Sequence, residues 1–186
     1  MRLTLLLFAA AALVHAQTPA PAAGLEPSWD IAVVLEEIGG NAARLVPVLD
    51  RLDVKNWLAQ GASDTYAAQL QSARDQARAA SDDAKALAKS PERLSAELEL
   101  FFRLDALERM LGSLEEGARK YQGAQFAQAV GAAFAEGGAN RERLRRYIVN
   151  LAAERERQFA VMDKEAQRCR DTLMAPAAPK TTGRKK

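Results

Sequence analysis

Leu94–Tyr121, with the sequence LSAELELFFRLDALERMLGSLEEGARKY, is the stretch from which the fold is predicted. Apolar residues recur in it at alternating steps of four and three, which places them on one face of a helix. This face comprises Leu100, Leu104, Leu107, Leu111, Leu114, Ala118 and Tyr121. A second stripe comprises Leu94, Leu98 and Phe101, and Phe102 widens it. Since a helix with two apolar stripes has to bury both, we predict that several other helices contact this one.

A second long helix is predicted to begin at Ser63, and a tight turn at Ser90 and Pro91 connects it to the central one. Its apolar seam is mostly alanine: Tyr66, Leu70, Ala73, Ala77, Ala80, Ala84 and Leu87. Small side chains allow two helix backbones to approach closely. In the turn, Ser90 is expected to cap the central helix and Pro91 to take its first position, with Glu92 near the positive helix end. Helices joined so tightly should run antiparallel.

The first helical segment begins after Ser28, which is placed to cap it. Gly39 and Gly40 interrupt its apolar pattern, and Pro47 removes a backbone donor inside it. We therefore expect two or three helical pieces here rather than one continuous helix.

The stretch from Gly123 to Gly137 is rich in alanine and carries almost no charge. We predict a short, closely packed helix. The alternative is a segment that inserts into a membrane or a partner, but the stretch is shorter than the roughly 20 residues that a spanning helix needs.

The last helix is predicted to be capped by Asn140 and to run from Arg141 to Leu173. One apolar stripe follows its whole length: Leu144, Ile148, Leu151, Phe159, Met162, Ala166, Cys169 and Leu173. Together these segments predict an all-α protein. We expect an antiparallel bundle over residues 28–174, with about four long helices and one or two short ones.

The two ends of the chain are expected to lie outside this domain. Residues 1–16 have a basic start, a short apolar run and small residues before Gln17, as a cleaved signal peptide does. No cysteine follows the run, so no lipid anchor is indicated. Residues 17–27 are a Pro- and Ala-rich linker, and residues 175–186 a disordered basic tail. These features predict a periplasmic or secreted protein.

The charge of the chain is concentrated in that tail. There are 26 basic and 24 acidic residues, a net charge of +2. The tail holds four cations that are placed to contact an anionic surface such as lipid head groups: Lys180, Arg184, Lys185 and Lys186. The alternative is a solubilising end without a partner. Basic residues are not interleaved with aromatic ones, so nucleic acid is not an expected partner.

Most catalytic constellations are excluded by the residues that the chain lacks. Signal cleavage would remove His15, the single histidine, and Cys169 is the single cysteine. Nucleophiles paired with histidine, zinc sites built from histidine or paired cysteines, and di-iron Glu-x-x-His motifs are therefore ruled out. We expect no catalytic residues, no metal and no cofactor.

Trp57, Tyr66 and Gln69 are the leading candidates for a binding site. Asp53 is placed to cap a short helical turn through Trp57, which Gly61 ends. Trp57 and Tyr66 should therefore lie close together at one end of the bundle. The favoured interpretation is that Trp57 is a core anchor. The alternative is the mouth of a pocket, with Gln69 as a polar contact.

Two further features concern polar residues on apolar faces. Arg155 interrupts the stripe of the last helix, and we predict that it pairs inside the bundle with Glu108 of the central helix. Cys169 lies on the same stripe between two arginines, and cationic neighbours favour a reactive thiolate. A buried, inert thiol is favoured there, and an intermolecular disulfide and a redox role are the alternatives.

The function predicted from these features is non-enzymatic. The chain is expected to be an exported interaction or scaffold component of the bacterial cell envelope. The alternative is a protein that binds a small apolar ligand between its helices. A large exposed apolar face would favour the first function, and a closed pocket of a few hundred cubic ångströms would favour the second.

Overall fold

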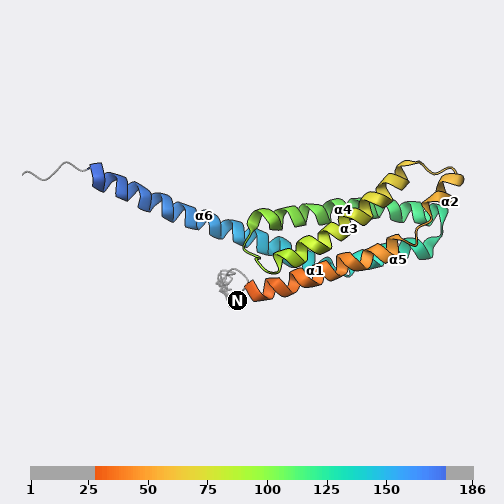
Figure 1. Ribbon diagram of the computed structural model, residues 1–186, viewed down its shortest axis with the longest axis horizontal. Coiled ribbons are helices and arrows are strands. Elements are labelled where there is room, and N and C mark those ends of the chain that lie inside the picture. Colours follow the sequence, from red (N-terminus) through yellow and green to blue (C-terminus); the bar gives the residue numbers. More distant parts are fainter. Residues whose placement is uncertain (1–27, 175–186) are drawn as a thin grey trace, which may run out of the picture.

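The computed structural model describes residues 28–174, which form helices and no strand (Figure 1). The helices are α1 (Ser28–Leu49), α2 (Val54–Ala59), α3 (Thr65–Leu87), α4 (Leu94–Tyr121), α5 (Ala124–Ala135) and α6 (Gly138–Met174). The predicted all-α helical bundle is therefore confirmed. The segments predicted to be a signal peptide, a linker and a basic tail lie outside the described residues.

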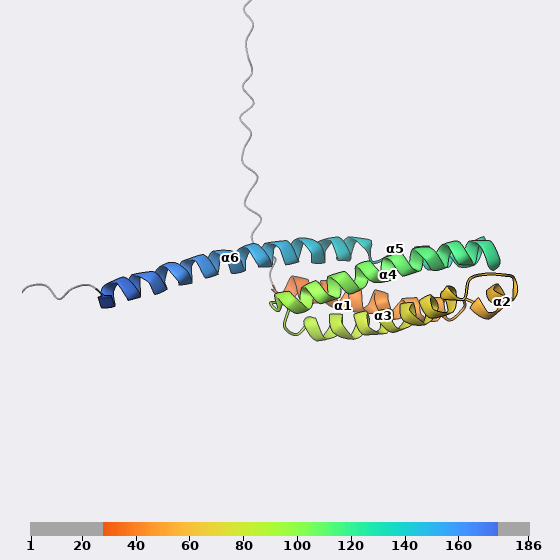
Figure 2. The same ribbon diagram turned by 90° about the horizontal axis from the view of Figure 1, so that it is seen from above.

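The body of the bundle has four helical segments that lie side by side along a common direction (Figures 1 and 2). They are α1, α3, α4, and a fourth formed by α5 followed by the first half of α6. The buried residues form two clusters along these segments. The first half of α6 covers one cluster, which contains Leu35, Leu100 and Leu144. Helix α5 covers the other, which contains Leu49 and Leu114.

Helix α4 covers the stretch from Leu94 to Tyr121 that carries the predicted stripes, and it contacts α2, α3, α5 and α6. It begins at Leu94, however, and not at Pro91, so the prediction that Ser90 caps it is wrong. Pro91 is buried in the connecting turn, and its carbonyl accepts a hydrogen bond of 3.0 Å from the Tyr147 hydroxyl. These residues hold the turn against α6 instead of starting the helix.

Helix α1 is continuous, which corrects the prediction of two or three pieces. Its glycines serve close packing: a Cβ on Gly39 would lie 3.1 Å from the Ser81 carbonyl oxygen of α3. Alanine on the facing side of α3 is what permits this approach, and Ala80 and Ala84 are fully buried. Pro47 is exposed and lies in the last turn of α1. The one backbone hydrogen bond that it removes is therefore close to the end of the helix.

Helix α5 confirms the prediction of a short helix, with Ala127 and Val130 buried against its neighbours. Helix α6 begins at Gly138, earlier than predicted, and the amide of Asn140 donates to Glu37 at 2.6 Å instead of capping it. Within residues 28–174, no helix combines the length and the apolar composition needed to cross a membrane.

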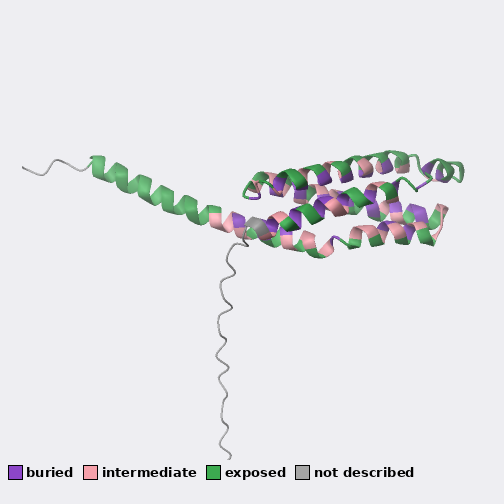
Figure 3. Cartoon of the chain, turned by 60° about the horizontal axis from the view of Figure 1, so that its bottom comes forward, coloured by how far each residue is buried: buried purple, intermediate pink, exposed green. Residues whose placement is uncertain are grey.

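The second half of α6 leaves the bundle (Figures 1 and 3). Leu144, Tyr147, Ile148 and Leu151 are buried, but every residue from 155 to 174 is exposed. We call residues 155–174 the α6 extension. At 1.5 Å per residue it is about 30 Å long. The apolar stripe of α6 is therefore packed in the first half of the helix and exposed in the second.

Candidate functional site

The predicted site around Trp57 is a packed corner of the bundle. Asp53 caps α2 as predicted, with its Oδ1 accepting from the backbone amide of Asn56 at 3.1 Å. Trp57 is fully buried, and its ring meets Tyr66 edge-on at 5.5 Å between centroids. The structure brings these two residues together, and the burial of Trp57 agrees with a core anchor.

Tyr121 and Gln122 complete this corner, and sequence analysis did not include them. The Tyr121 ring stacks on Trp57 at 6.3 Å, and Gln122 Oε1 accepts from Trp57 Nε1 at 3.0 Å. Gly117 lies against the same rings, where a Cβ would be 2.8 Å from atoms of both Trp57 and Tyr66. The stripe of α4 ends at Tyr121, which is the signal that places that residue here.

Gln69 does not face an open site. Its Oε1 accepts a hydrogen bond of 3.0 Å from the Ser113 hydroxyl of α4. This contact joins the beginning of α3 to the last third of α4, near the Trp57 end of the bundle. Gln69 is therefore a structural link between two helices rather than a free polar group beside Tyr66.

Arg155 and Glu108 do not pair, which corrects the prediction of a buried ion pair. Both are exposed, and Arg155 donates to Gln158 Oε1 at 3.2 Å and to the Glu92 carbonyl at 3.3 Å. Helices α4 and α6 run antiparallel, so Arg155 lies beside the beginning of α4. Glu108 is about 20 Å further along α4. It lies in a groove with Arg141. Burial lowers the pKa of Arg141, and the negative charge of Glu108 opposes part of this shift.

Glu97 is the buried polar residue that sequence analysis missed. It is fully buried in the first turn of α4, and neither carboxyl oxygen has a hydrogen-bond partner among the described residues. Burial raises the pKa of Glu97 to about 7. The sequence did contain a signal: Glu97 lies seven residues before Leu104, one heptad earlier on the main stripe of α4.

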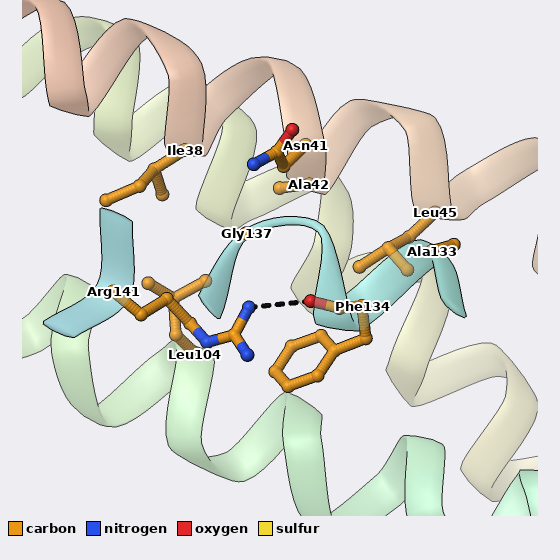
Figure 4. A pocket seen from close by; sticks show the side chains of 9 residues that line it. All are labelled: Ile38, Asn41, Ala42, Leu45, Leu104, Ala133, Phe134, Gly137 and Arg141. Carbon is orange, nitrogen blue, oxygen red and sulfur yellow. Dashed lines mark hydrogen bonds between the residues drawn. The ribbon is translucent and has the colours of Figure 1, made fainter. Parts of the chain in front are cut away.

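A small cavity lies where α5 meets α6, close to α1 and α4 (Figure 4). Its apolar wall includes Leu104 and Phe134, and the guanidinium of Arg141 stacks 3.7 Å above the Phe134 ring. Arg141 also donates to the Phe134 carbonyl at 2.8 Å. The cavity volume is about 10 Å³, room for about one water molecule. It is far below the roughly 300 Å³ that a small-molecule pocket needs, so this cavity is too small to hold an apolar ligand.

On the α6 extension, several large apolar side chains are exposed along one stripe of the helix. Phe159, Met162 and Leu173 are 75%, 68% and 84% exposed. With Ala166 and Cys169 they form what we call the extension stripe. Their steps of three and four are those of a heptad pattern.

Cys169 is exposed on this stripe, which corrects the expectation of a buried thiol. The apolar pattern predicted a face that packs, but no part of residues 28–174 covers it. The cations Lys180, Arg184, Lys185 and Lys186 lie outside the described residues, so their role stays a prediction.

Comparison with protein families, with curated proteins and with solved structures finds no match to this chain. Among the residues that the structure describes, no group of three or more His, Cys, Asp or Glu side chains is placed to hold a metal ion. The exposed face of the α6 extension is the candidate functional site.

Proposed function

We propose that this chain is a non-enzymatic interaction protein that binds another polypeptide through the extension stripe. The observation that supports the proposal is the exposure of Phe159, Met162 and Leu173 on one face of a projecting helix. Single exposed apolar residues are ordinary, but an aligned stripe of them is typical of helix-mediated recognition.

The composition of the extension supports a protein partner over a purely structural spacer. A helix that only holds two parts of a molecule apart gains nothing from an apolar face in water. The other faces of the extension carry ion pairs within the helix, such as Arg168 with Glu165 at 2.9 Å. The charged residues from 156 to 174 thus lie away from the extension stripe, as they do in amphipathic helices that pack on a partner.

The proposed location is outside the cytoplasm, and it rests on residues 1–16 alone. A chain cleaved before Gln17 would lack His15 and would act in the cell envelope or beyond it. N-terminal sequencing of the protein isolated from its own cells checks this. We expect Gln17 as the first residue, and an intact Met1 would contradict export by cleavage.

The interaction is tested by photo-crosslinking in cells, with a photoreactive amino acid at Met162 or at Lys164. These two positions lie about 160° apart around the helix. We expect a crosslink to a polypeptide from position 162, on the extension stripe, and little from position 164. Mass spectrometry then identifies whether that polypeptide is another protein or a second copy of this chain.

Equal crosslinking from both positions would mean that the stripe has no special role. Absence of any polypeptide crosslink from position 162 would overturn the proposal. Crosslinks to lipid at that position would replace the protein partner with a membrane surface, to which amphipathic helices also bind.

A further inference from the structure

We infer that the partner of the extension stripe is a second copy of this chain, with two α6 extensions packed antiparallel. This inference rests on the proposed function and names the partner for the same site. It follows from where the stripe faces, from which orientation leaves room for the bundles, and from how side-chain sizes match along the helix.

The extension stripe faces the same side of α6 as the bundle does. At 100° per residue, the buried Leu144, Ile148 and Leu151 and the five stripe residues fall within one arc of roughly 80°. The bundle ends beside Arg155, which contacts the Glu92 carbonyl in the turn between α3 and α4. Beyond that turn, the extension projects past the end of the bundle (Figure 2). Its large apolar side chains are exposed.

Only an antiparallel second helix fits on this face. In a parallel pair, equivalent residues lie side by side, so the first halves of the two α6 helices would also meet. That face of α6 is already covered by α1 and α4 of its own chain. In an antiparallel pair, the second bundle lies beyond the far end of the first extension, and both stripes are free to pack.

The sizes of the stripe residues select one register. In this register the two-fold axis crosses the helices at the level of residue 164. Phe159 then faces Cys169 of the second copy, and Met162 faces Ala166 of the second copy. Each large side chain thus meets a small one, which is how antiparallel helix faces fill space without clashes. At the ends of the contact, Leu173 of one copy lies over the stem of Arg155 of the other.

Shifting the helices by one further heptad toward the bundles is blocked. Leu173 of the second copy would then lie over Ile148, which is only 7% exposed. The chosen register is therefore the longest overlap that the bundles allow. It covers residues 155–173, about 28 Å of helix.

Charge contributes little to this pairing, so the apolar stripe has to drive it. Beside the stripe, Glu156 would lie near Arg170 of the second copy, an attraction that occurs twice by symmetry. Near the two-fold axis, Asp163 would lie close to Asp163 of the second copy, and Glu165 close to Glu165 of the second copy. The repulsion between these like charges opposes association. Exposed pairs of this kind are individually weak, and the contact is at the small end of stable interfaces, so we expect a dissociation constant on the order of micromolar.

The first test compares two neighbouring apolar residues of the extension by sedimentation equilibrium. Met162 lies on the stripe, and Val161 is also exposed, at 62%, but points away from it. We expect the parent to dimerise, Met162→Asp to raise the dissociation constant at least about tenfold, and Val161→Asp to leave it almost unchanged. A parent that stays monomeric at high micromolar concentration would overturn the inference, as would equal effects of the two variants.

The second test reads the orientation through disulfide formation under mild oxidation. In the antiparallel register, Cys169 lies about 15 Å from Cys169 of the second copy, measured along the helix axis. A disulfide needs Cα atoms within about 7 Å, so the parent should not crosslink. Phe159→Cys places a second thiol opposite Cys169 of the other copy and should give a disulfide-linked dimer. Ala160→Cys, off the stripe, should not.

The outcomes separate this inference from the proposed function. A Cys169–Cys169 crosslink in the parent would show a parallel pair and overturn the antiparallel arrangement. A monomeric parent that still crosslinks to a different protein from position 162 in cells would overturn self-association alone. A monomer without any such crosslink would overturn both.

Discussion

The two halves of α6 have the same apolar spacing and opposite surroundings. In the first half, Leu144, Ile148 and Leu151 are buried against α1 and α4. In the second half, Phe159, Met162 and Leu173 are exposed. The helix itself continues without a break across this boundary. The difference shows that spacing determines which face of a helix is apolar, whereas the length of the neighbouring helices determines how much of that face the chain covers.

The position of the boundary has a simple cause. Helices α3 and α4 are joined by a turn, and the carbonyls of Pro91 and Glu92 in that turn contact Tyr147 and Arg155 of α6. No described residue of the chain lies beyond this turn to cover the rest of α6. The apolar face that continues past residue 155 is therefore uncovered within residues 28–174.

The largest contrast is expected from truncating one aromatic side chain in each region. Trp57→Ala should cost about 3–5 kcal/mol of unfolding free energy, because it empties a fully buried site. Phe159→Ala removes an aromatic ring that is 75% exposed. It should change the stability of the dilute protein by less than about 0.5 kcal/mol. Urea unfolding followed by circular dichroism measures both. A stable Trp57→Ala protein would mean that this corner is not a core anchor.

The buried carboxyl of Glu97 is expected to change the unfolding free energy by about 3 kcal/mol across the pH range in which it titrates. Burial raises its pKa from 4.5 to about 7. The folded state therefore holds this proton more tightly than the unfolded state does. The stabilisation from the protonated form is fully present below pH 4.5, falls as the pH rises from 4.5 to about 7, and is absent above that range.

Unfolding free energies of the parent and of Glu97→Gln across this pH range test the assignment. The parent should lose stability relative to the variant between pH 4.5 and about 7. Glu165→Gln, on the exposed α6 extension, is the matched control. Its unfolding free energy should change with pH in the same way as that of the parent. If Glu97→Gln also ran parallel to the parent, the carboxyl would have to reach water or a partner in solution.

Sequence reasoning predicted the helices well and the surroundings of individual polar residues poorly. The bounds of α4 and the alanine seam of α3 follow from apolar periodicity, which the local chain determines. The environments of Arg155 and Cys169 depend on where α3 and α4 end relative to α6, a relation between distant segments that no local pattern records. Glu97 was missed because its residue type indicates solvent, although its heptad position indicates the core.

A smaller contrast, of about 1–3 kcal/mol, is expected between two glycines of α4. A Cβ on Gly117 would lie 2.8 Å from the rings of Trp57 and Tyr66, whereas a Cβ on Gly112 would meet nothing within 4 Å. Gly117→Ala should therefore destabilise the bundle by overpacking. Gly112→Ala should stabilise it by up to about 1 kcal/mol through helix propensity. Thermal unfolding of both variants checks this, and equal shifts would contradict the close packing at Gly117.

The smallest effect is expected from ending the chain after Glu154, which removes the α6 extension. Residues 155–174 bury nothing in the single chain, so the dilute protein should keep its unfolding free energy within about 0.5 kcal/mol. At higher concentration the two forms should diverge. Dimerisation stabilises the folded parent by mass action, so its melting temperature should rise with protein concentration, while that of the shortened chain should not. A loss of several kcal/mol in the dilute shortened chain would instead mean that the extension folds back on the bundle in solution, and the boundary between the two halves of α6 would no longer separate a packed face from a free one.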